Sequence, residues 1–339
     1  MRTRSPLVRL LALTLSVACG CAMATEAGRH NDLNGDGRSD LLWRNATTGA
    51  LVMWSGAFPT LALTLRLSEP VPGGLTAAQW PVVVAYQLVP NFPPDLALQD
   101  VGGKGIDLET RDVPGPYAGY YRVYPSGLYA SPDWKLVGAG HFNPNLWAPG
   151  GTLYRNQRDG SNTICCTYTD ADDGWGTIAT PVPLTRVTNL AWEVAGIGDF
   201  NGDLVADVLW RNAVTGANAV WLAANAGNQL RVTSVTNLDW KVAAVGDFNG
   251  DGHVDIFWRN ARSGANTIWK SGNAATQQAV TSVPNLAWQV ATTGDFDRDG
   301  KADVVWRNTS TGANTIWLSA NSATQRPLPS VNLAWQLVK

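Results

Sequence analysis

The stretch Asp-Phe-Asn-Gly-Asp-Gly-His-Val-Asp at residues 247–255, followed at once by Ile-Phe-Trp-Arg-Asn at 256–260, is the most informative part of this sequence. It places carboxylate or amide oxygens at loop positions 1, 3, 5 and 9 and a glycine at position 6. Alternate side chains of a tight loop can converge on one point, and the main-chain carbonyl at position 7 can join them. The loop therefore suits a hard cation, and the apolar residues after it begin a strand.

The same pattern, here called an acidic loop, recurs and sets the period of the chain. Acidic loops start at residues 199, 247 and 295, and a further one starts at residue 32. Trp192, Trp240 and Trp288 precede three of them, and each is followed by another tryptophan 18 residues later. Each unit contains four short apolar runs with turn residues between them and no helical period. Four strands in about 48 residues is the size of one β-propeller blade.

Two upstream segments keep this unit without its acidic residues. Trp134 leads into a loop that begins at His141, and Trp80 leads into one near residue 87. The first unit starts directly at its loop, whereas the chain ends on a strand around Trp335 with no loop after it. Joined, the two ends complete one blade and bury both edges. We therefore expect an all-β fold, a six-bladed β-propeller of four-stranded blades with loops at about 32, 87, 141, 199, 247 and 295, closed by pairing of the N- and C-terminal segments.

Residues 1–24 predict a secretory signal peptide. Arg2, Arg4 and Arg9 precede an apolar run, and Ala-Met-Ala at residues 22–24 forms a cleavage site of small residues. Residues 25–339 would then form a single propeller domain that is secreted, periplasmic or at the cell surface. A lipoprotein anchored at Cys19 or Cys21 is the alternative. No later apolar run approaches the ~20 residues of a membrane span.

The charge and cysteine content of the mature chain exclude two classes of protein. Without the three arginines of the leader, 22 of the 25 basic residues remain against 27 acidic ones, so the net charge of −5 argues against a nucleic-acid partner. The remaining cysteines, Cys165 and Cys166, are adjacent and can close only a strained small ring. This excludes a disulfide scaffold and leaves open whether the two are bonded.

Asp-Phe-Asn-Gly-Asp-Gly, with a further Asp three residues later and then Trp-Arg-Asn, resembles the FG-GAP/VCBS repeats of bacterial exported proteins. These repeats are related to the calcium-binding repeats of integrin α-chain propellers. The resemblance covers nearly the whole mature chain, with four well-preserved units and two worn ones. It implies a β-propeller with Ca²⁺ between the first and second strands of its blades. Integrin-type propellers have seven blades, so seven is the alternative to six.

Up to four Ca²⁺ ions are therefore expected, one in each acidic loop. Oxygen ligands with three or four carboxylates favour Ca²⁺ over zinc or copper, whereas the alternative is that Asp, Asn and Gly simply form turns. Loop 199–207 is expected to bind most weakly because Leu204 replaces the glycine at position 6. The predicted ligands, by side chain or by the carbonyl of position 7, are Asp32, Asn34, Asp36, Arg38 and Asp40; Asp199, Asn201, Asp203, Val205 and Asp207; Asp247, Asn249, Asp251, His253 and Asp255; and Asp295, Asp297, Asp299, Lys301 and Asp303.

Other repeated residues are expected to be architectural. Tryptophans in register should pack in the core, and the recurring arginines 44, 211, 259 and 307 should bind a loop carboxylate or main-chain carbonyls. The ring of His253 is expected to point to water, since position 7 needs only its carbonyl. Trp147 and Trp175 lie out of register, and Trp175 follows three aspartates. This predicts an exposed ligand-binding patch, with a solvated loop as the alternative; its residues are Trp147, Asp170, Asp172, Asp173 and Trp175.

The sequence contains no recognisable catalytic constellation. It has no zinc-binding His pair, no nucleophile elbow and no histidine placed to activate a cysteine, so we do not expect an enzyme. The function predicted is a secreted, calcium-binding module for binding or adhesion, with a glycan or an extracellular protein as its ligand. The alternatives are a hydrolase or lyase that acts on extracellular polysaccharide through carboxylates, and a purely structural module.

Overall fold

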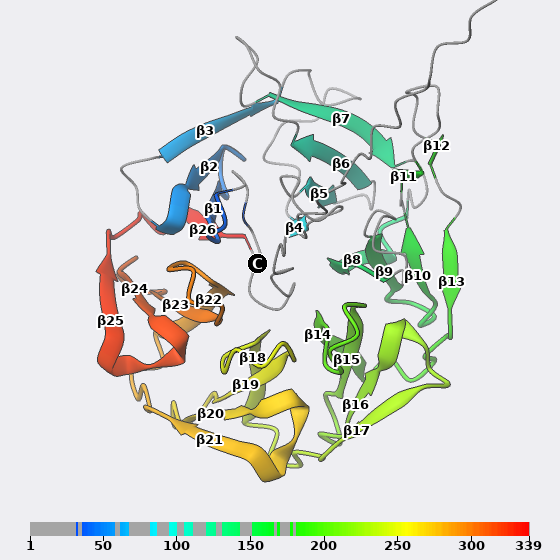
Figure 1. Cartoon of the computed structure of the whole chain (residues 1–339). Coiled ribbons are helices and arrows are strands. Elements are labelled where there is room, and N and C mark those ends of the chain that lie inside the picture. Colours follow the sequence, from blue (N-terminus) through cyan, green and yellow to red (C-terminus); the bar gives the residue numbers. More distant parts are fainter. Residues whose placement is uncertain are drawn as a thin grey trace, which may run out of the picture.

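The fold is a closed ring of β-sheets (Figure 1). The computed structural model describes residues 32, 36–57, 62–67, 82–86, 95–99, 105–110, 120–126, 131–142, 151–165, 168–169, 177–178 and 181–338. The predicted leader, residues 1–24, lies outside this part of the chain. Within the described residues, no helix has the length and apolar character needed to cross a membrane.

Three consecutive repeats form sheets of the same design, each with its strands ordered from the ring centre to the rim (Figure 1). Their strands are β14 (Trp192–Gly198), β15 (Asp207–Asn212), β16 (Asn218–Trp221) and β17 (Gln229–Val232); β18 (Trp240–Gly246), β19 (Asp255–Asn260), β20 (Asn266–Trp269) and β21 (Gln277–Val280); and β22 (Trp288–Gly294), β23 (Asp303–Asn308), β24 (Asn314–Trp317) and β25 (Gln325–Leu328). Short 3-10 turns follow the third strands: η5 (Leu222–Ala224), η6 (Lys270–Gly272), η7 (Ala274–Thr276), η8 (Leu318–Ala320) and η9 (Ser322–Thr324). The predicted four-stranded repeat is confirmed.

The upstream sheets follow the same radial order. One consists of β8 (Trp134–Gly140), β9 (Gly151–Asn156), β10 (Asn162–Cys165) and β13 (Val182–Leu184), with a separate ribbon of β11 (Tyr168–Thr169) and β12 (Thr177–Ile178). The remaining strands are β1 (Leu41–Asn45), β2 (Leu51–Trp54), β3 (Ala62–Leu67), β4 (Val82–Tyr86), β5 (Asp95–Gln99), β6 (Gly105–Thr110), β7 (Tyr120–Ser126) and β26 (Trp335–Leu337), with the turn η2 (Ser55–Ala57) after β2. Cys165 is disulfide-bonded, and its partner lies outside the described residues.

The predicted number of blades is wrong. In the part of the chain that the structure describes, the ring has five blades rather than six or seven: four sheets of four strands and one continuous sheet of eight, ordered β26-β1-β2-β3-β7-β6-β5-β4. The cause is a parallel pair between β3 and β7, in which Arg66 lies opposite Tyr120 and Leu67 opposite Tyr121. Strands that the sequence assigned to two blades therefore share one sheet.

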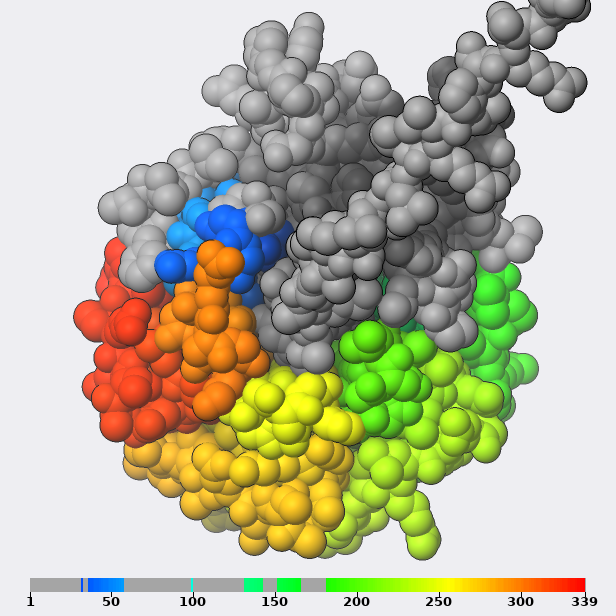
Figure 2. All heavy atoms as spheres, viewed as in Figure 1, coloured from blue at the N-terminus to red at the C-terminus, as the bar shows by residue number. Residues whose placement is uncertain are grey.

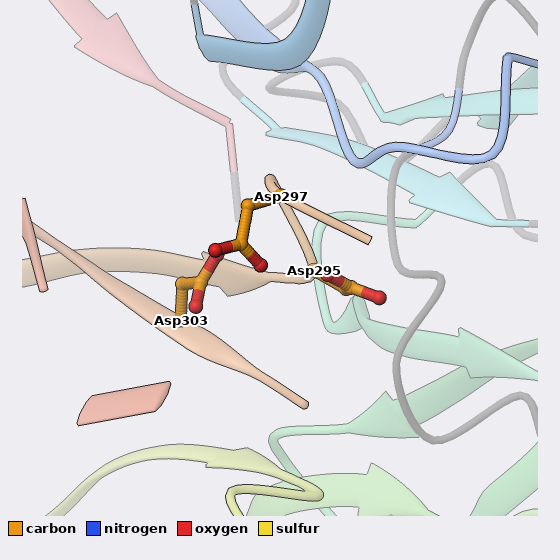
Figure 3. Close-up of side chains that lie close together, drawn as sticks. All are labelled: Asp295, Asp297 and Asp303. Atoms are coloured by element: carbon orange, nitrogen blue, oxygen red, sulfur yellow. The ribbon is translucent and has the colours of Figure 1, made fainter. Parts of the chain in front are cut away.

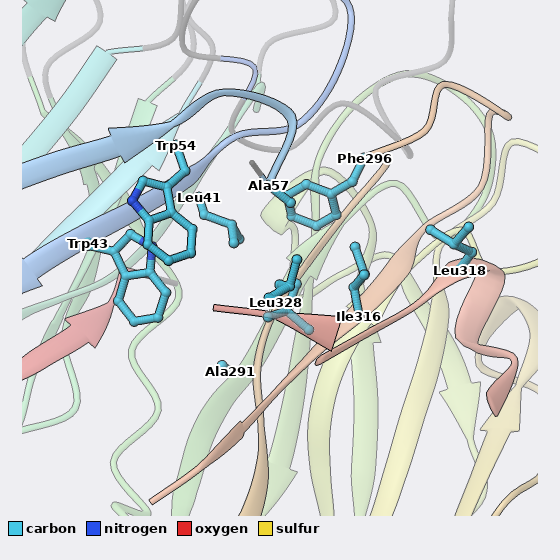
Figure 4. Packing of buried hydrophobic residues seen from close by; sticks show 10 residues of the cluster. Leu41, Trp43, Trp54, Ala57, Ala291, Phe296, Ile316, Leu318 and Leu328 are labelled. Atoms are coloured by element: carbon cyan, nitrogen blue, oxygen red, sulfur yellow. The ribbon is translucent and has the colours of Figure 1, made fainter. Parts of the chain in front are cut away.

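The predicted closure by the two ends of the chain is confirmed. Strand β26 pairs antiparallel with β1, with Trp43 opposite Leu337 and Asn45 opposite Trp335. In the space-filling view residues 36–57, in blue, lie directly against the orange residues of the last repeat (Figure 2). The junction has its own core, in which Trp43 and Trp54 pack with residues of the last repeat such as Phe296 (Figure 4). Burial of aromatic area at this seam closes the ring.

Adjacent sheets are also joined by buried arginines. In the last three repeats, Arg211 lies 4.8 Å above the Trp258 ring of the next blade, and Arg259 lies 4.9 Å above the Trp306 ring. Arg211 also donates from Nη2 to the carbonyls of Val235 (3.1 Å) and Trp240 (2.9 Å). The arginines therefore bind main-chain carbonyls, one of the two partners expected, and hold one blade against the next.

Candidate metal centre

The acidic loops lie where the first two strands of a blade meet, as predicted. Loop 247–255 joins β18 to β19 and loop 295–303 joins β22 to β23, so the residue at position 9 is the first residue of the second strand. The apolar residues after position 9 are buried in that strand, whereas positions 3 to 6 reach toward the surface. Each loop is thus held at its two ends by the sheet and presents its polar residues at the inner rim of the ring.

The carboxylate at position 1 orders the main chain of its own loop. In loop 247–255, Oδ1 of Asp247 accepts hydrogen bonds from the amides of Gly250 (2.6 Å) and Asp251 (3.2 Å), and Oδ2 accepts one from Gly252 (2.8 Å). The loops at 199 and 295 have the same arrangement, and in the first loop Asp32 accepts from Gly37 at 2.8 Å. The turn-forming role considered as an alternative is therefore confirmed for position 1.

The carboxylate at position 9 is fully buried and joins two turns. In Asp255, Oδ2 accepts from the amide of Phe248 (3.1 Å), and Oδ1 accepts from the amide of Ser271 (2.8 Å) in η6. Ser271 has a φ of 48°, so this bond holds a left-handed turn in place. Asp207 and Asp303 make equivalent bonds. Sequence reasoning missed the partner in the 3-10 turn, although it always lies 16 residues after position 9.

Burial of these carboxylates raises their pKa values. The pKa of Asp255 is raised to about 7, mainly by burial and further by the neighbouring carboxylates Asp247 and Asp251. The hydrogen bonds from Ser271 and Phe248 lower it, but by less. The same causes raise the pKa of Asp303 to about 7 and that of Asp207 to about 6. These three loops therefore concentrate carboxylates at a place where water solvates negative charge poorly, and a bound cation would offset that charge.

Loop 295–303 brings three carboxylates together. Oxygens of Asp295, Asp297 and Asp303 all lie within 4.8 Å of one another, and Figure 3 shows Asp297 and Asp303 directed toward each other. The Oδ1 atom of Asp297 is buried and has no hydrogen-bond partner. An all-carboxylate group with an unsatisfied buried oxygen fits a hard divalent cation, since carboxylate oxygens keep lone pairs beyond those that the amides use.

The loops with asparagine at position 3 are arranged differently. Nδ2 of Asn249 donates to Oδ2 of Asp251 at 2.8 Å, and Nδ2 of Asn201 donates to Oδ2 of Asp203 at 2.9 Å. These two loops thus use their own amide to satisfy a carboxylate that the prediction assigned to the ion. In the first loop Asp32, Asp36 and Asp40 are described, whereas Asn34 lies outside the described residues.

The expectation for His253 is wrong. Its ring does not point to water but lies on the neighbouring loop, with Nδ1 3.3 Å from the carbonyl oxygen of Phe200. A Cβ atom built on Gly202 would come within 2.8 Å of the ring, so the glycine is what allows this close contact. Loop position 7 therefore has a second use, as a contact between blades.

The predicted ligand-binding patch stays a prediction. Trp147, Asp170, Asp172, Asp173 and Trp175 all lie outside the described residues. The tryptophans in register that the structure describes are buried or half-buried, as expected, and form tilted pairs such as Trp258 with Trp269, whose ring centroids are 5.1 Å apart.

Comparison with known proteins supports the repeat assignment. Residues 199–258 and 247–306 match the FG-GAP-like repeat family, which confirms the resemblance for this part of the chain. No curated protein matches the chain in sequence.

Among solved structures, a lectin from Agrocybe aegerita, described as recognising non-reducing terminal N-acetylglucosamine, is similar with 13% identity and a TM-score of 0.52 over 89% of this chain and 85% of that one. AofleA from Arthrobotrys oligospora is 13% identical with a TM-score of 0.44, covering 86% of this chain and 87% of that one. An inactive virginiamycin B lyase from Staphylococcus aureus is 9% identical with a TM-score of 0.44, covering 83% and 78%.

Proposed function

We propose that this chain, a β-propeller in which residues 199–306 match FG-GAP-like repeats, is an exported, calcium-stabilised binding module whose ligand is a glycan. The proposal has two parts, the ion and the ligand, and each has its own support and its own test.

One observation supports the calcium part: the carboxylate group of loop 295–303 with the buried, unpartnered Oδ1 of Asp297. A cation bound there would be held by Asp295, Asp297 and Asp303 and would neutralise a charge that burial disfavours. It would also fix the start of β23 relative to the loop, because Asp303 begins that strand. Extracellular calcium sites commonly bind at about 10⁻⁴–10⁻³ M, which suits a structural ion.

The proposed binding function is supported by the structural roles of the repeated residues, which leave recognition to the loops. In the described blades the recurring arginines hold neighbouring sheets together and the aspartates at positions 1 and 9 hold turns, so these groups serve the scaffold. A rigid scaffold that carries its recognition on loops is typical of binding propellers. The Agrocybe aegerita lectin shares this fold, and its recognition of a terminal sugar directs the proposal to glycans rather than to proteins.

The calcium part is tested by thermal unfolding with and without EDTA. Calcium at 100 times its Kd should stabilise the protein by about 2.7 kcal/mol per site, so the Tm should rise with calcium concentration. Magnesium at the same concentration serves as the control, because it accepts an all-protein oxygen cage poorly. A Tm that does not respond to calcium would refute this part.

The ligand part is tested on a glycan array in calcium buffer, followed by chromatography of the bound sugars after long incubation. Binding to a set of glycans that are recovered intact is the expected result. Release of new reducing ends or unsaturated sugars would show an enzyme instead. Absence of both signals would leave a structural module and refute the glycan proposal.

A further inference from the structure

Neighbouring acidic loops are joined to each other by main-chain hydrogen bonds. The amide of Val254, at position 8 of its loop, donates to the carbonyl of Asp199, at position 1 of the preceding loop, at 2.7 Å. Ala302 donates in the same way to Asp247 at 2.7 Å, and Ser39 donates to Asp295 at 2.8 Å across the closure of the ring. Each acceptor residue carries the carboxylate predicted as the first ligand of its own loop.

The amide that donates each of these hydrogen bonds belongs to a peptide group whose carbonyl is the predicted position-7 ligand of its own loop. The carbonyl of His253 and the amide of Val254 are the two ends of one planar peptide unit, and that carbonyl is the predicted position-7 ligand of loop 247–255. A cation that draws on the carbonyl polarises the peptide and strengthens the hydrogen bond that its amide donates to Asp199. One rigid unit therefore touches two candidate sites.

Side chains reinforce each link. His253 covers Gly202 of the preceding loop, and Lys301 covers Gly250, whose built Cβ would lie 3.2 Å from the lysine Cγ. At the closure the amide of Asp295 donates to Oγ of Ser39 at 2.9 Å, so that pair of residues bonds in both directions. Ordering one loop thus restrains the main chain of its neighbour.

From these links we propose that the acidic loops bind their cations cooperatively, in a line that runs from loop 32–40 through 295–303 and 247–255 to 199–207. This inference rests on the calcium binding proposed above. The line ends at His141, which accepts from Ala206 at 2.7 Å but begins a loop without the acidic residues. Electrostatic repulsion between ions in neighbouring loops would by itself make binding anticooperative. The proposal is specifically that the hydrogen-bonded links outweigh this repulsion, so that binding in one loop strengthens binding in the next.

Two proteins that each keep two intact loops test this. In both, unwanted loops are silenced by Asp→Asn at position 5, which removes a carboxylate but keeps the Oδ1 acceptor that Asp251, for example, offers to the His253 amide. Asp36→Asn with Asp203→Asn leaves the adjacent loops 247–255 and 295–303. Asp36→Asn with Asp251→Asn leaves the separated loops 199–207 and 295–303 as the matched control.

Calcium titration by calorimetry is the measurement. Loop 295–303 is expected to bind about tenfold more tightly than either partner loop, which lowers both Hill coefficients. A fivefold coupling, at the low end for linked sites, then gives the adjacent pair a Hill coefficient of about 1.1, whereas the uncoupled, separated pair should give about 0.7. Equal Hill coefficients for the two pairs, with calcium bound, would overturn the coupling alone. Failure of the unaltered protein to bind calcium would overturn the proposed function as well.

Hydrogen exchange provides a second measurement, which compares one single variant with the unaltered protein and does not depend on a comparison between two double variants. With Asp251→Asn alone, calcium should protect the amides of residues 199–207 about fivefold less than in the unaltered protein, although no residue of that loop has changed. Equal protection in the two proteins would contradict the proposal.

Discussion

Loops 295–303 and 199–207 have the same backbone and different chemistry. In both, the carboxylate at position 1 binds loop amides and the one at position 9 binds the second loop residue and a 3-10 turn. They differ at positions 3, 4, 6 and 7, where Asp297, Arg298, Gly300 and Lys301 stand against Asn201, Gly202, Leu204 and Val205. The shared residues build the loop, and the differing ones decide what the loop can hold.

The difference at position 3 replaces the donor of one hydrogen bond. Asn201 donates to Oδ2 of Asp203, whereas Asp297 has no proton to donate, and the corresponding oxygen of Asp299 accepts from Oγ of Ser319 at 2.9 Å. Oδ1 of Asp297 is then left buried without a partner. A change of one side-chain group thus converts a loop that satisfies itself into one that carries excess negative charge, and only the latter requires a cation to be at its most stable.

The largest expected effect is at position 9, which the two loops share. Asp303→Asn and Asp207→Asn each place an NH₂ group against a main-chain N–H in a fully buried site. In saturating calcium we expect Asp303→Asn to lower the free energy of unfolding by about 3 kcal/mol, since a buried unsatisfied donor costs about 1–3 kcal/mol and a ligand is lost too. Urea denaturation measures this.

Asp303→Asn and Asp207→Asn should lower the free energy of unfolding by different amounts in calcium and by the same amount in EDTA. The two aspartates make the same hydrogen bonds, so only the calcium affinity of their loops differs. Equal losses of stability in calcium as well as in EDTA would contradict this difference in affinity. Asp203→Asn, on the exposed surface and with its Oδ1 acceptor retained, is the control and should change stability in EDTA by no more than ~0.5 kcal/mol.

The next effect is at position 3. Asp297→Asn should weaken the tightest calcium site about tenfold, because affinity in such loops follows the number of carboxylate ligands. Asn201→Asp, the reciprocal change, should strengthen the site in loop 199–207 by a similar factor. Calorimetric titration of the two variants beside the unaltered protein measures both. Affinities that stay the same after the exchange would mean that position 3 does not set the difference.

The periodic pattern of side chains in the sequence was enough to predict the strands of each repeat and the closure of the ring. The 48-residue repeat predicted the four strands of each unit, and the incomplete units at the two ends predicted the pairing of β26 with β1. It did not predict that β3 and β7 pair, because a parallel contact between two rim strands far apart in the chain leaves no pattern in either one. The blade count was wrong for that reason.

The same limit applies to the loops. Position-1 and position-9 carboxylates were predicted to be ligands, with turn formation as the alternative. The particular amides that they bind were not predicted, since an amide donor has no residue type to signal it. The His253 ring was assigned to solvent because its neighbour, Gly202, lies in another repeat and becomes close only in the ring. Contacts between blades depend on tertiary geometry, which a repeat considered alone does not contain.

The smallest expected effect is at position 6. Leu204 has a φ of 66°, in the region where Gly252 and Gly300 have φ values of 84° and 80° at the same loop position. A side chain in the left-handed region costs about 1–2 kcal/mol, part of which glycine loses again through the entropy of the unfolded chain. Leu204→Gly should therefore raise the free energy of unfolding by about 0.5–1 kcal/mol in EDTA.

Leu204→Ala separates backbone strain from the loss of the leucine side chain. The alanine variant keeps the Cβ atom, so its difference from Leu204→Gly isolates the strain, and the glycine variant should be the more stable of the two. Gly252→Ala in the neighbouring loop should be destabilising by a similar amount. Thermal unfolding of the three variants beside the unaltered protein gives both differences. If the alanine and glycine variants are equally stable, the lower affinity expected of loop 199–207 cannot come from backbone strain at position 6, and the other positions at which the loops differ, position 3 first among them, would have to account for it.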